Sequence, residues 1–434
     1  MTDLQIGFAG FACIIALIGL RFPVGLALIL VALVGISLVA GPDVALSVLR
    51  FIPFDFIANW DLSAVPMFLL MGAVAHHSGM TEKLFAVARL WFSGLPGGLA
   101  VATNFACAGF SSASGSSLAT SMAVGRITIP EMRKHGYDDG LASGVVACGG
   151  TLGVLIPPSI ILVIYGIIAE VSVAKLFIAG ILPGILTALV FAAQIVIRCT
   201  FNPNLAPRIK DAVTWRMRFA ALPGVWPLVL LILTIIGSIY SGIATPTEAG
   251  ALGAFLSVVI ATLQGRMSFS AFRAAARESA ASTASIFFVA IGAVLLTRFM
   301  AFSGVPEFLG DFVVEYGVST IQIVLLCFVI YLLLGMFVDP MGMMLLTLPV
   351  LLPMLQAANL DLIWFGILVV KFIEIGLITP PVGLNVYAVK LIDPGIEIRS
   401  VFKGALWFLL SEAVVITLLI AVPAITLFLP QNLN

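Results

Sequence analysis

The 434-residue chain carries little charge. Asp, Glu, Lys and Arg make up 10% of it, and 21 basic side chains balance 21 acidic ones. No basic tract and no interleaving of aromatic and basic residues is present, which argues against a nucleic-acid partner. The hydrophobic content of 61% exceeds that of soluble globular domains. The composition therefore predicts an all-α polytopic membrane protein that lies in a lipid bilayer.

Several motifs of metal sites, pumps and enzymes are missing. The cysteines stand singly, without a CxxC pair, so neither a disulfide framework nor a thiolate metal site is indicated. No lysine is followed by serine or threonine, which excludes a Walker A loop and therefore nucleotide as the energy source. The absence of G-x-S-x-G and HExxH motifs argues that the protein is not an enzyme.

Long apolar runs dominate what is present. A span of about 20 apolar residues suffices to cross a bilayer as a helix. This criterion predicts membrane-spanning helices near residues 4–20, 23–41, 62–79, 139–166, 176–197, 222–240, 247–264, 280–300, 363–390 and 404–428. Segment 81–95 has one apolar and one basic face, which is typical of a helix lying along the membrane surface.

Two further apolar regions, 97–130 and 320–357, each have the length of two short helices. Small residues or glycine and proline interrupt both, in "GFSSASGSSLA" and "GMFVDPMGMM". We predict two re-entrant hairpins, because irregular backbone at membrane depth is tolerated only where protein buries it or water reaches it.

The basic residues are distributed unevenly between alternate loops. With the N-terminus outside, most lysines and arginines fall on the cytoplasmic side, including those of the long polar segment 198–221. The positive-inside rule therefore predicts that both termini lie outside and that 198–221 is a cytoplasmic linker.

The two halves of the chain are related. At a spacing of 223 residues, Pro130 matches Pro353, Asp138 matches Asp361, Gly153 matches Gly376, and the pair Pro157 and Pro158 matches Pro380 and Pro381. We predict a first repeat over 1–197, with scaffold helices in 1–80, the interfacial helix 81–95, the hairpin 97–130 and the broken helix 139–166. The second repeat covers 222–434, with the hairpin 320–357 and the broken helix 363–390. An odd number of spans in each half makes the repeat inverted, which is typical of secondary transporters.

The paired prolines break the helices in a way that frees backbone oxygen atoms. Pro157 and Pro158 supply no amide hydrogen, so upstream carbonyls lose their helical donors and become available to a cation. The tip of the first hairpin adds hydroxyl oxygens around Gly115, from Ser111, Ser112, Ser114, Ser116 and Ser117. The alternatives are an ordinary proline kink and close packing of small residues between helices.

The segments from "GFSSASGSSLATSMAVGRITIPEM" to "GTLGVLIPPS", together with "GIATPTEAGALGAF" and "GLITPPVGLNVY", resemble the large membrane subunit of tripartite ATP-independent periplasmic (TRAP) transporters, the DctM-like family. The resemblance extends over essentially the whole chain. It implies an elevator-type importer in the bacterial inner membrane, driven by the Na+ gradient. It also implies a small four-helix membrane subunit and a periplasmic binding protein that delivers a carboxylate substrate, such as sialic acid or a dicarboxylate.

The resemblance also implies site residues. One sodium site is expected at Ser111, Ser114, Gly153, Ile156 and Pro158. A second sodium site is expected at Gly335, Gly376, Thr379 and Val382, and substrate contacts are expected at Ser112, Ser116 and Asn385. Two other functions stay open: an ion-coupled carrier of another inverted-repeat family that acts alone, and, with less support, an intramembrane enzyme.

Two smaller patterns have structural interpretations. Thr245, Pro246 and Glu248 are spaced as the N-cap, first-turn proline and N3 glutamate of a helix, so we predict a helix start at 246. Lys371 and Glu374 lie one turn apart in a predicted span and are expected to neutralise each other.

Overall fold

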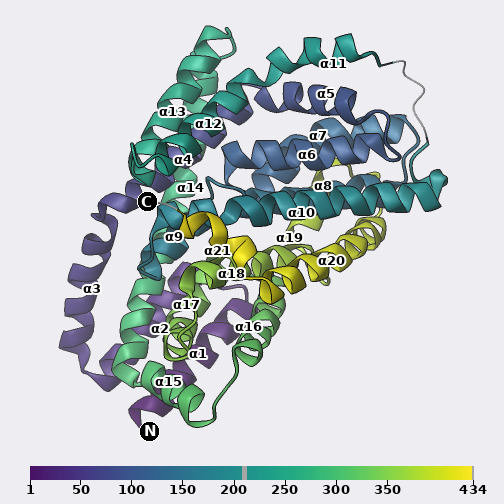
Figure 1. Ribbon diagram of the computed structural model, residues 1–434. Coiled ribbons are helices and arrows are strands. Elements are labelled where there is room, and N and C mark those ends of the chain that lie inside the picture. The colour runs from purple at the N-terminus through teal and green to yellow at the C-terminus, as the bar shows by residue number, and fades with distance from the viewer. Residues whose placement is uncertain (208–212, 433–434) are drawn as a thin grey trace.

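A computed structural model describes residues 1–207 and 213–432, and all regular structure in these two ranges is helical (Figure 1). The first half contains α1 (Asp3–Gly19), α2 (Val24–Val39), α3 (Pro42–Ile57), α4 (Ala64–His77), α5 (Met80–Phe92), α6 (Gly98–Ser114), α7 (Ser117–Lys134), α8 (Asp139–Leu155), α9 (Ile160–Ile168) and α10 (Val173–Phe201). The second contains α11 (Trp215–Ala221), α12 (Trp226–Tyr240), α13 (Pro246–Leu263), α14 (Phe269–Ser303), α15 (Val305–Glu315), α16 (Thr320–Gly335), α17 (Pro340–Ala357), α18 (Leu362–Ile378), α19 (Leu384–Ile392), α20 (Ile398–Ala421) and α21 (Ala424–Gln431).

The predicted all-α membrane fold is confirmed. Within the described residues, 6 helical segments are long and apolar enough to cross a membrane, or up to 8 if each of two bent pairs is one span. One of these pairs is α8 and α9, which are bent by 41° at the first pair of prolines. The chain is therefore a multi-pass membrane protein.

The positions of several helices differ from the prediction. Residues 42–57 were not predicted to be helical but form α3, whose apolar run is interrupted by Asp43, Arg50 and Asp55. The span predicted at 280–300 is only part of α14, which has 35 residues. The span predicted at 404–428 is two helices, α20 and α21, because the chain breaks near Pro423.

The helices start where side-chain caps are available. Asp138 accepts a hydrogen bond from the Leu141 amide at the start of α8, and Asp361 accepts one from the Trp364 amide at the start of α18. The predicted capping box is present, since Thr245 and Glu248 bond reciprocally at the start of α13. Such caps satisfy the first amides of a helix, which have no partner within it.

Corresponding helices of the two halves have matching bounds. Moving α7 and α8 by 223 residues gives the bounds of α17 and α18. In each half, two helices form a hairpin that packs against the first segment of a broken helix: α6 and α7 against α8, and α16 and α17 against α18. The spacing of 223 residues between matching prolines and aspartates therefore also separates the corresponding helices.

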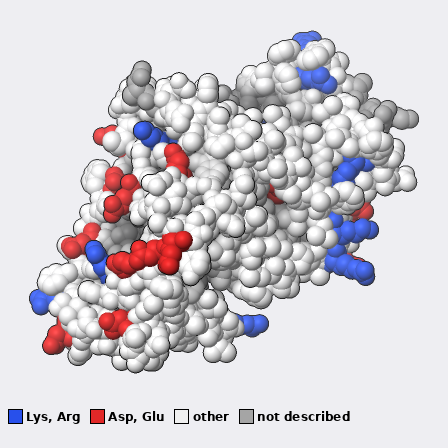
Figure 2. All heavy atoms as spheres, turned by 60° about the horizontal axis from the view of Figure 1, so that its bottom comes forward, with Lys and Arg blue, Asp and Glu red and all other residues white. Residues whose placement is uncertain are grey.

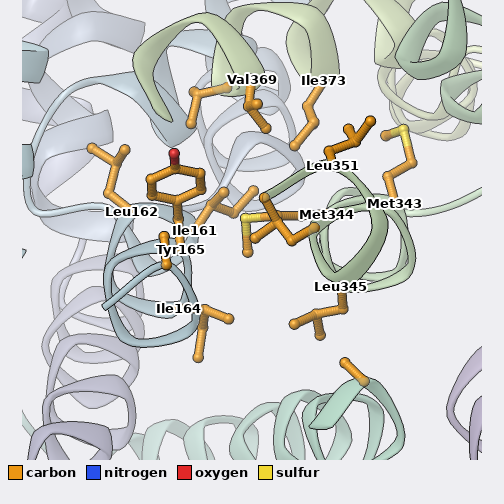
Figure 3. Packing of buried hydrophobic residues seen from close by; sticks show 14 of the residues in the cluster. Ile161, Leu162, Ile164, Tyr165, Met343, Met344, Leu345, Leu351, Val369 and Ile373 are labelled. Carbon is orange, nitrogen blue, oxygen red and sulfur yellow. The ribbon is translucent and has the colours of Figure 1, made fainter. Parts of the chain in front are cut away.

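The segment after each break packs against the other half of the chain. α9 contacts α17 and α18, where Figure 3 shows Tyr165 and Ile161 near Met344 and Val369. The Tyr165 hydroxyl donates a 2.7 Å hydrogen bond to the carbonyl of Leu362. In the opposite direction, α19 packs against α7 and α8. This exchange holds the two breaks in one body.

A second group of helices surrounds the scaffold predicted for residues 1–80. α14 packs along α2 and α4, and α13 packs along α4. Figure 1 shows α3 at the left edge of the molecule.

The charged side chains are unevenly distributed over the surface. Figure 2 shows that acidic side chains prevail on the left of its view and that basic side chains gather on the right.

Candidate functional site

The tip of the first hairpin rests on the first break. Gly115 turns the chain between α6 and α7 with a φ of 60°, a conformation that glycine adopts without strain. A Cβ on Gly153 would lie 2.6 Å from the carbonyl oxygen of Ser116. Because that neighbour is backbone, only glycine allows the tip and the break to approach this closely.

Hydroxyl groups line this contact. The Ser114 and Thr120 hydroxyl oxygens are 2.8 Å apart, and the Ser114 hydroxyl also lies 3.4 Å from the Ser116 carbonyl oxygen. Ser111 is fully buried and donates a 2.5 Å hydrogen bond to the carbonyl of Cys107. The hydroxyl oxygens of Ser111 and Ser114 keep lone pairs that can bind a cation.

The first break leaves several carbonyls without donors. The Ser159 hydroxyl donates to the carbonyl of Val154. Within the described residues, the carbonyl oxygens of Gly153, Leu155 and Ile156 accept no hydrogen bond. Pro157 has no amide hydrogen to give to the Gly153 carbonyl, and the Leu155 and Ile156 carbonyls lack donors because α8 ends at Leu155. The structure thus brings Ser114, Gly153 and the break at Pro158 together, while the Ile156 side chain packs toward Gly184 of α10.

The second hairpin and the second break meet even more closely. A Cβ on Gly335 would lie 2.6 Å from the Cα atom of Gly376, and a Cβ on Gly376 would lie 2.8 Å from the Cα atom of Gly335. The backbones of α16 and α18 are therefore in direct contact at two residues that were predicted to share a site. Tyr331 lies one turn earlier in α16, and its hydroxyl oxygen accepts a 2.6 Å hydrogen bond from the Thr347 hydroxyl of α17.

The second break offers oxygen atoms of the same kinds. The Thr379 hydroxyl donates a 2.6 Å hydrogen bond to the carbonyl of Ile375, and the Thr379 amide donates to the carbonyl of Gly376. In this part of the described chain, the carbonyls of Leu377, Ile378 and Val382 accept no hydrogen bond. Both breaks therefore combine a hydroxyl with unpaired carbonyls, and hard oxygen ligands of this type suit an alkali cation.

The residues predicted to bind substrate each make a hydrogen bond to the backbone. Ser112 bonds within its own helix, at 3.5 Å from the Ala108 carbonyl, and the Ser116 hydroxyl caps α7 by accepting from the Ala119 amide. Asn385 is fully buried and donates a 3.1 Å hydrogen bond to the carbonyl of Ala147 in α8. No hydrogen bond within the described residues joins these three side chains to one another.

A buried charge cluster near the second break was only partly predicted. The Lys371 ammonium lies 2.6 Å from a carboxylate oxygen of Glu374, and all three charged side chains of the cluster are fully buried. The third is Glu412 of α20, at 2.7 Å from Lys371. Glu412 stands in the middle of an apolar span, and an acidic residue in that position signals a buried partner. The spacing of residues along the chain does not identify this partner as Lys371.

The sequence of the chain matches a known family of membrane proteins. The family model described as "Tripartite ATP-independent periplasmic transporter, DctM component" matches residues 11–425. The chain belongs to the DctM family. It is 34% identical over 401 residues to the C4-dicarboxylate TRAP transporter large permease protein DctM of Pseudomonas aeruginosa, covering 90% of this chain and 93% of that protein.

Other relatives differ in the substrate that their names state. The sialic acid TRAP transporter large permease protein SiaM of Vibrio cholerae is 30% identical over 418 residues, covering 95% of this chain and 96% of that protein. The isethionate TRAP transporter permease protein DctMQ of Oleidesulfovibrio alaskensis is 30% identical, and the match covers 96% of this chain but 65% of that protein.

A solved structure has a similar fold. The Alcanivorax borkumensis YdaH transporter, described as having an unusual topology, superposes with a TM-score of 0.62 at 17% identity, covering 88% of this chain and 90% of that one. This likeness concerns the fold alone. The family assignment identifies the chain as a large permease component of the bacterial inner membrane, and its relatives are named as transporter components and not as enzymes.

Proposed function

We propose that this large permease couples the entry of Na+ to the import of a carboxylate-bearing organic anion. The observation that carries the proposal is the repeated arrangement in which a hairpin packs on a proline break whose carbonyls accept no hydrogen bond. Backbone carbonyls released in this way are the usual ligands of coupling ions in transporters with broken helices. Ser114 and Thr379 each add a hydroxyl oxygen, one to each proposed site.

The proposed transport motion is an elevator-like movement of the hairpins and broken helices along the scaffold. Support comes from Gly72 of α4, where a Cβ would lie 2.9 Å from both the Ala113 carbonyl oxygen and the Ser114 Cα atom. At Gly72 the scaffold therefore presents bare backbone to the C-terminal end of α6. A smooth contact of this kind allows one body to slide on another.

The proposed partners are a small membrane subunit and a periplasmic binding protein. The matched family is described as one component of a tripartite periplasmic transporter, and the DctMQ relative extends beyond the length that this chain matches. We propose that the first two helices, predicted at 4–41, and the segment after Thr81 form the surface on which the small subunit docks. Transport in vesicles by this chain alone would contradict the proposed need for both partners.

The substrate class is proposed from the relatives. Their names state C4-dicarboxylates, sialic acid and isethionate, which are all organic anions. A binding screen of carboxylates and sulfonates against the periplasmic binding protein that functions with this chain would identify the substrate.

The sodium proposal is tested by uptake into proteoliposomes that contain the chain with its partners, at a series of Na+ concentrations. Ser114→Ala and Thr379→Val each remove one hydroxyl ligand, which costs on the order of 1–3 kcal/mol, or about ten- to a hundredfold in ion affinity. Each uptake curve is expected to shift to higher Na+ concentration, with a lower Hill coefficient.

Two matched variants remove hydroxyls outside the proposed sites. Ser257 of α13 donates 2.7 Å to the Ala254 carbonyl, and Thr103 of α6 donates 2.8 Å to the Leu99 carbonyl; both are fully buried. Ser257→Ala and Thr103→Val should leave the Na+ dependence of uptake unchanged. Equal Na+ curves for all four variants and the parent would mean that the breaks are proline kinks without a coupling role.

A further inference from the structure

A small cavity lies at the ends of α10 and α20, away from both breaks. Its volume is about 130 Å3, and it is lined by Asp138, Arg198, Ser400, Lys403, Gly404 and Trp407. In Figure 1 the end of α10 and the start of α20 both lie at the right of the view. The chain has thus brought two basic side chains from distant segments to one cavity.

The two cations of this cavity outnumber its one carboxylate, that of Asp138. Within the residues that the structure describes, neither Arg198 nor Lys403 forms a hydrogen bond or an ion pair, and the Nη1 atom of Arg198 is buried without an acceptor. The one carboxylate in the lining, that of Asp138, accepts from the Leu141 amide. Since a buried donor without a partner costs about 1–3 kcal/mol, the Nη1 atom of Arg198 favours a bound acceptor in the cavity.

Trp407 fixes the guanidinium of Arg198. The Cζ atom of Arg198 lies 4.6 Å from the centre of the Trp407 ring, within the range of a cation–π contact. Lys403 precedes Trp407 by four residues in α20, so the two share one face of this helix. The two cations are therefore oriented toward the same space.

The length of α10 indicates that the cavity lies at the depth of lipid headgroups. α10 has 29 residues, a length of about 43 Å, whereas the hydrocarbon core of a bilayer is about 30 Å thick. Arg198 stands in the last turn of α10, so it emerges from the hydrocarbon at the headgroup layer. Tryptophan is also enriched at this level.

The surface next to the cavity is apolar and open toward lipid. Trp407 is 45% exposed, and Leu410 and Val414, which follow it on the same face of α20, are 61% and 52% exposed. An acyl chain can lie along this face while the headgroup occupies the cavity. A free anion would make no use of the apolar face.

We infer that Arg198, Lys403 and Trp407 form a binding site for the phosphate headgroup of an anionic phospholipid. Basic pockets between membrane helices on the cytoplasmic side are suited to such headgroups. The site does not depend on the proposed sodium coupling, because none of its residues belongs to either proposed sodium site. Its occupant satisfies the unpaired Arg198 nitrogen and neutralises the excess positive charge.

The test is native mass spectrometry of the purified full chain titrated with phosphatidylglycerol or with phosphatidylcholine of the same acyl chains. Phosphatidylglycerol should be retained more strongly. Arg198→Ala and Lys403→Ala should each weaken its retention by about tenfold or more, the usual effect of removing a hydrogen bond to a charged group. Lys403 is exposed, so its replacement leaves the packing of α20 intact even if Arg198→Ala fails to fold.

Arg399→Ala is the matched control. Arg399 lies one turn before Lys403 on α20, is exposed and does not line the cavity, so its loss should leave lipid retention unchanged. Equal retention of the two lipids, unchanged binding by the Lys403 variant, or an equal loss in the Arg399 variant would overturn the inference. Displacement of the lipid by millimolar inorganic phosphate would also overturn it, since the occupant would then be a soluble anion.

Discussion

Replacing Gly376 by alanine tests whether the contact between α16 and α18 shapes the second proposed sodium site. The added Cβ would lie 2.8 Å from the Gly335 Cα atom and 3.2 Å from the Tyr331 carbonyl oxygen. Both neighbours are backbone atoms, so no side chain can rotate away. Ordinary carbon contacts are about 3.5–4.0 Å, so α16 and α18 must separate by roughly 0.7–1.2 Å.

Overpacking of this kind costs about 1–3 kcal/mol. Alanine recovers about 0.5–1 kcal/mol in a helix relative to glycine, so we expect a net destabilisation of about 1–2 kcal/mol. If sodium binding requires the native spacing, the same strain opposes binding and lowers the sodium affinity by about five- to thirtyfold. The first proposed site, around Ser114 and Gly153, should be unaffected.

The assay is thermal unfolding of the purified chain at increasing Na+ concentration, with K+ keeping the ionic strength constant. A ligand that binds only the native state raises the midpoint temperature of unfolding. The stabilisation grows with the logarithm of one plus the ratio of ligand concentration to Kd. Gly376→Ala should unfold at a lower temperature and need about five to thirty times more Na+ for the same rise.

Gly237→Ala in α12 is the control for this variant, because no atom lies within 4 Å of its added Cβ. It should match the parent or gain up to about 1 kcal/mol in stability. If Gly376→Ala has the same unfolding midpoint and the same dependence on Na+ concentration as Gly237→Ala, the close contact between α16 and α18 does not form the site.

Three other expectations concern stability and topology. Lys371→Met leaves two buried carboxylates without their cation and should destabilise the fold by about 3–5 kcal/mol in denaturant unfolding; an unchanged midpoint would contradict a structural role for the cluster. A cysteine at exposed Asn204 should react only with cytoplasmic thiol reagents and one at exposed Tyr316 only with periplasmic reagents, whereas the reverse labelling would invert the predicted topology. The hydrogen bond from Arg133 holds the pKa of Asp393 below its ordinary value. The stabilisation of the fold by this pair should therefore persist above about pH 4 and disappear as the pH falls through the depressed pKa of Asp393. The difference in unfolding midpoint between Asp393→Asn and the parent should therefore stay constant from about pH 5 to 8, and a difference that vanishes at neutral pH would show that the ion pair contributes nothing.

The repeat explains why much of the fold could be predicted from sequence. Proline pairs and N-capping aspartates act through local backbone chemistry, so Pro157 and Asp138 mark the end and the start of α8 without knowledge of the rest of the chain. The same residue types mark α18. Hydropathy, by contrast, missed α3, because its charged residues interrupt an apolar run that is nevertheless helical.

Contacts between distant segments could not be predicted. Glu412 joins Lys371 from a different helix, and Asn385 bonds to Ala147 across the two halves. Nothing in the spacing of these residues specifies which helix faces which.

Direct binding of radioactive Na+ to the purified permease tests the central claim, that each proline break forms a sodium site. The measurement compares the saturation level of the parent with that of Ser114→Ala, Thr379→Val and the double variant, in lipid and without substrate. We predict that each single variant loses the high-affinity binding of one ion and that the double variant loses both. Binding that saturates at the same level and the same Na+ concentration in all four proteins would contradict the claim.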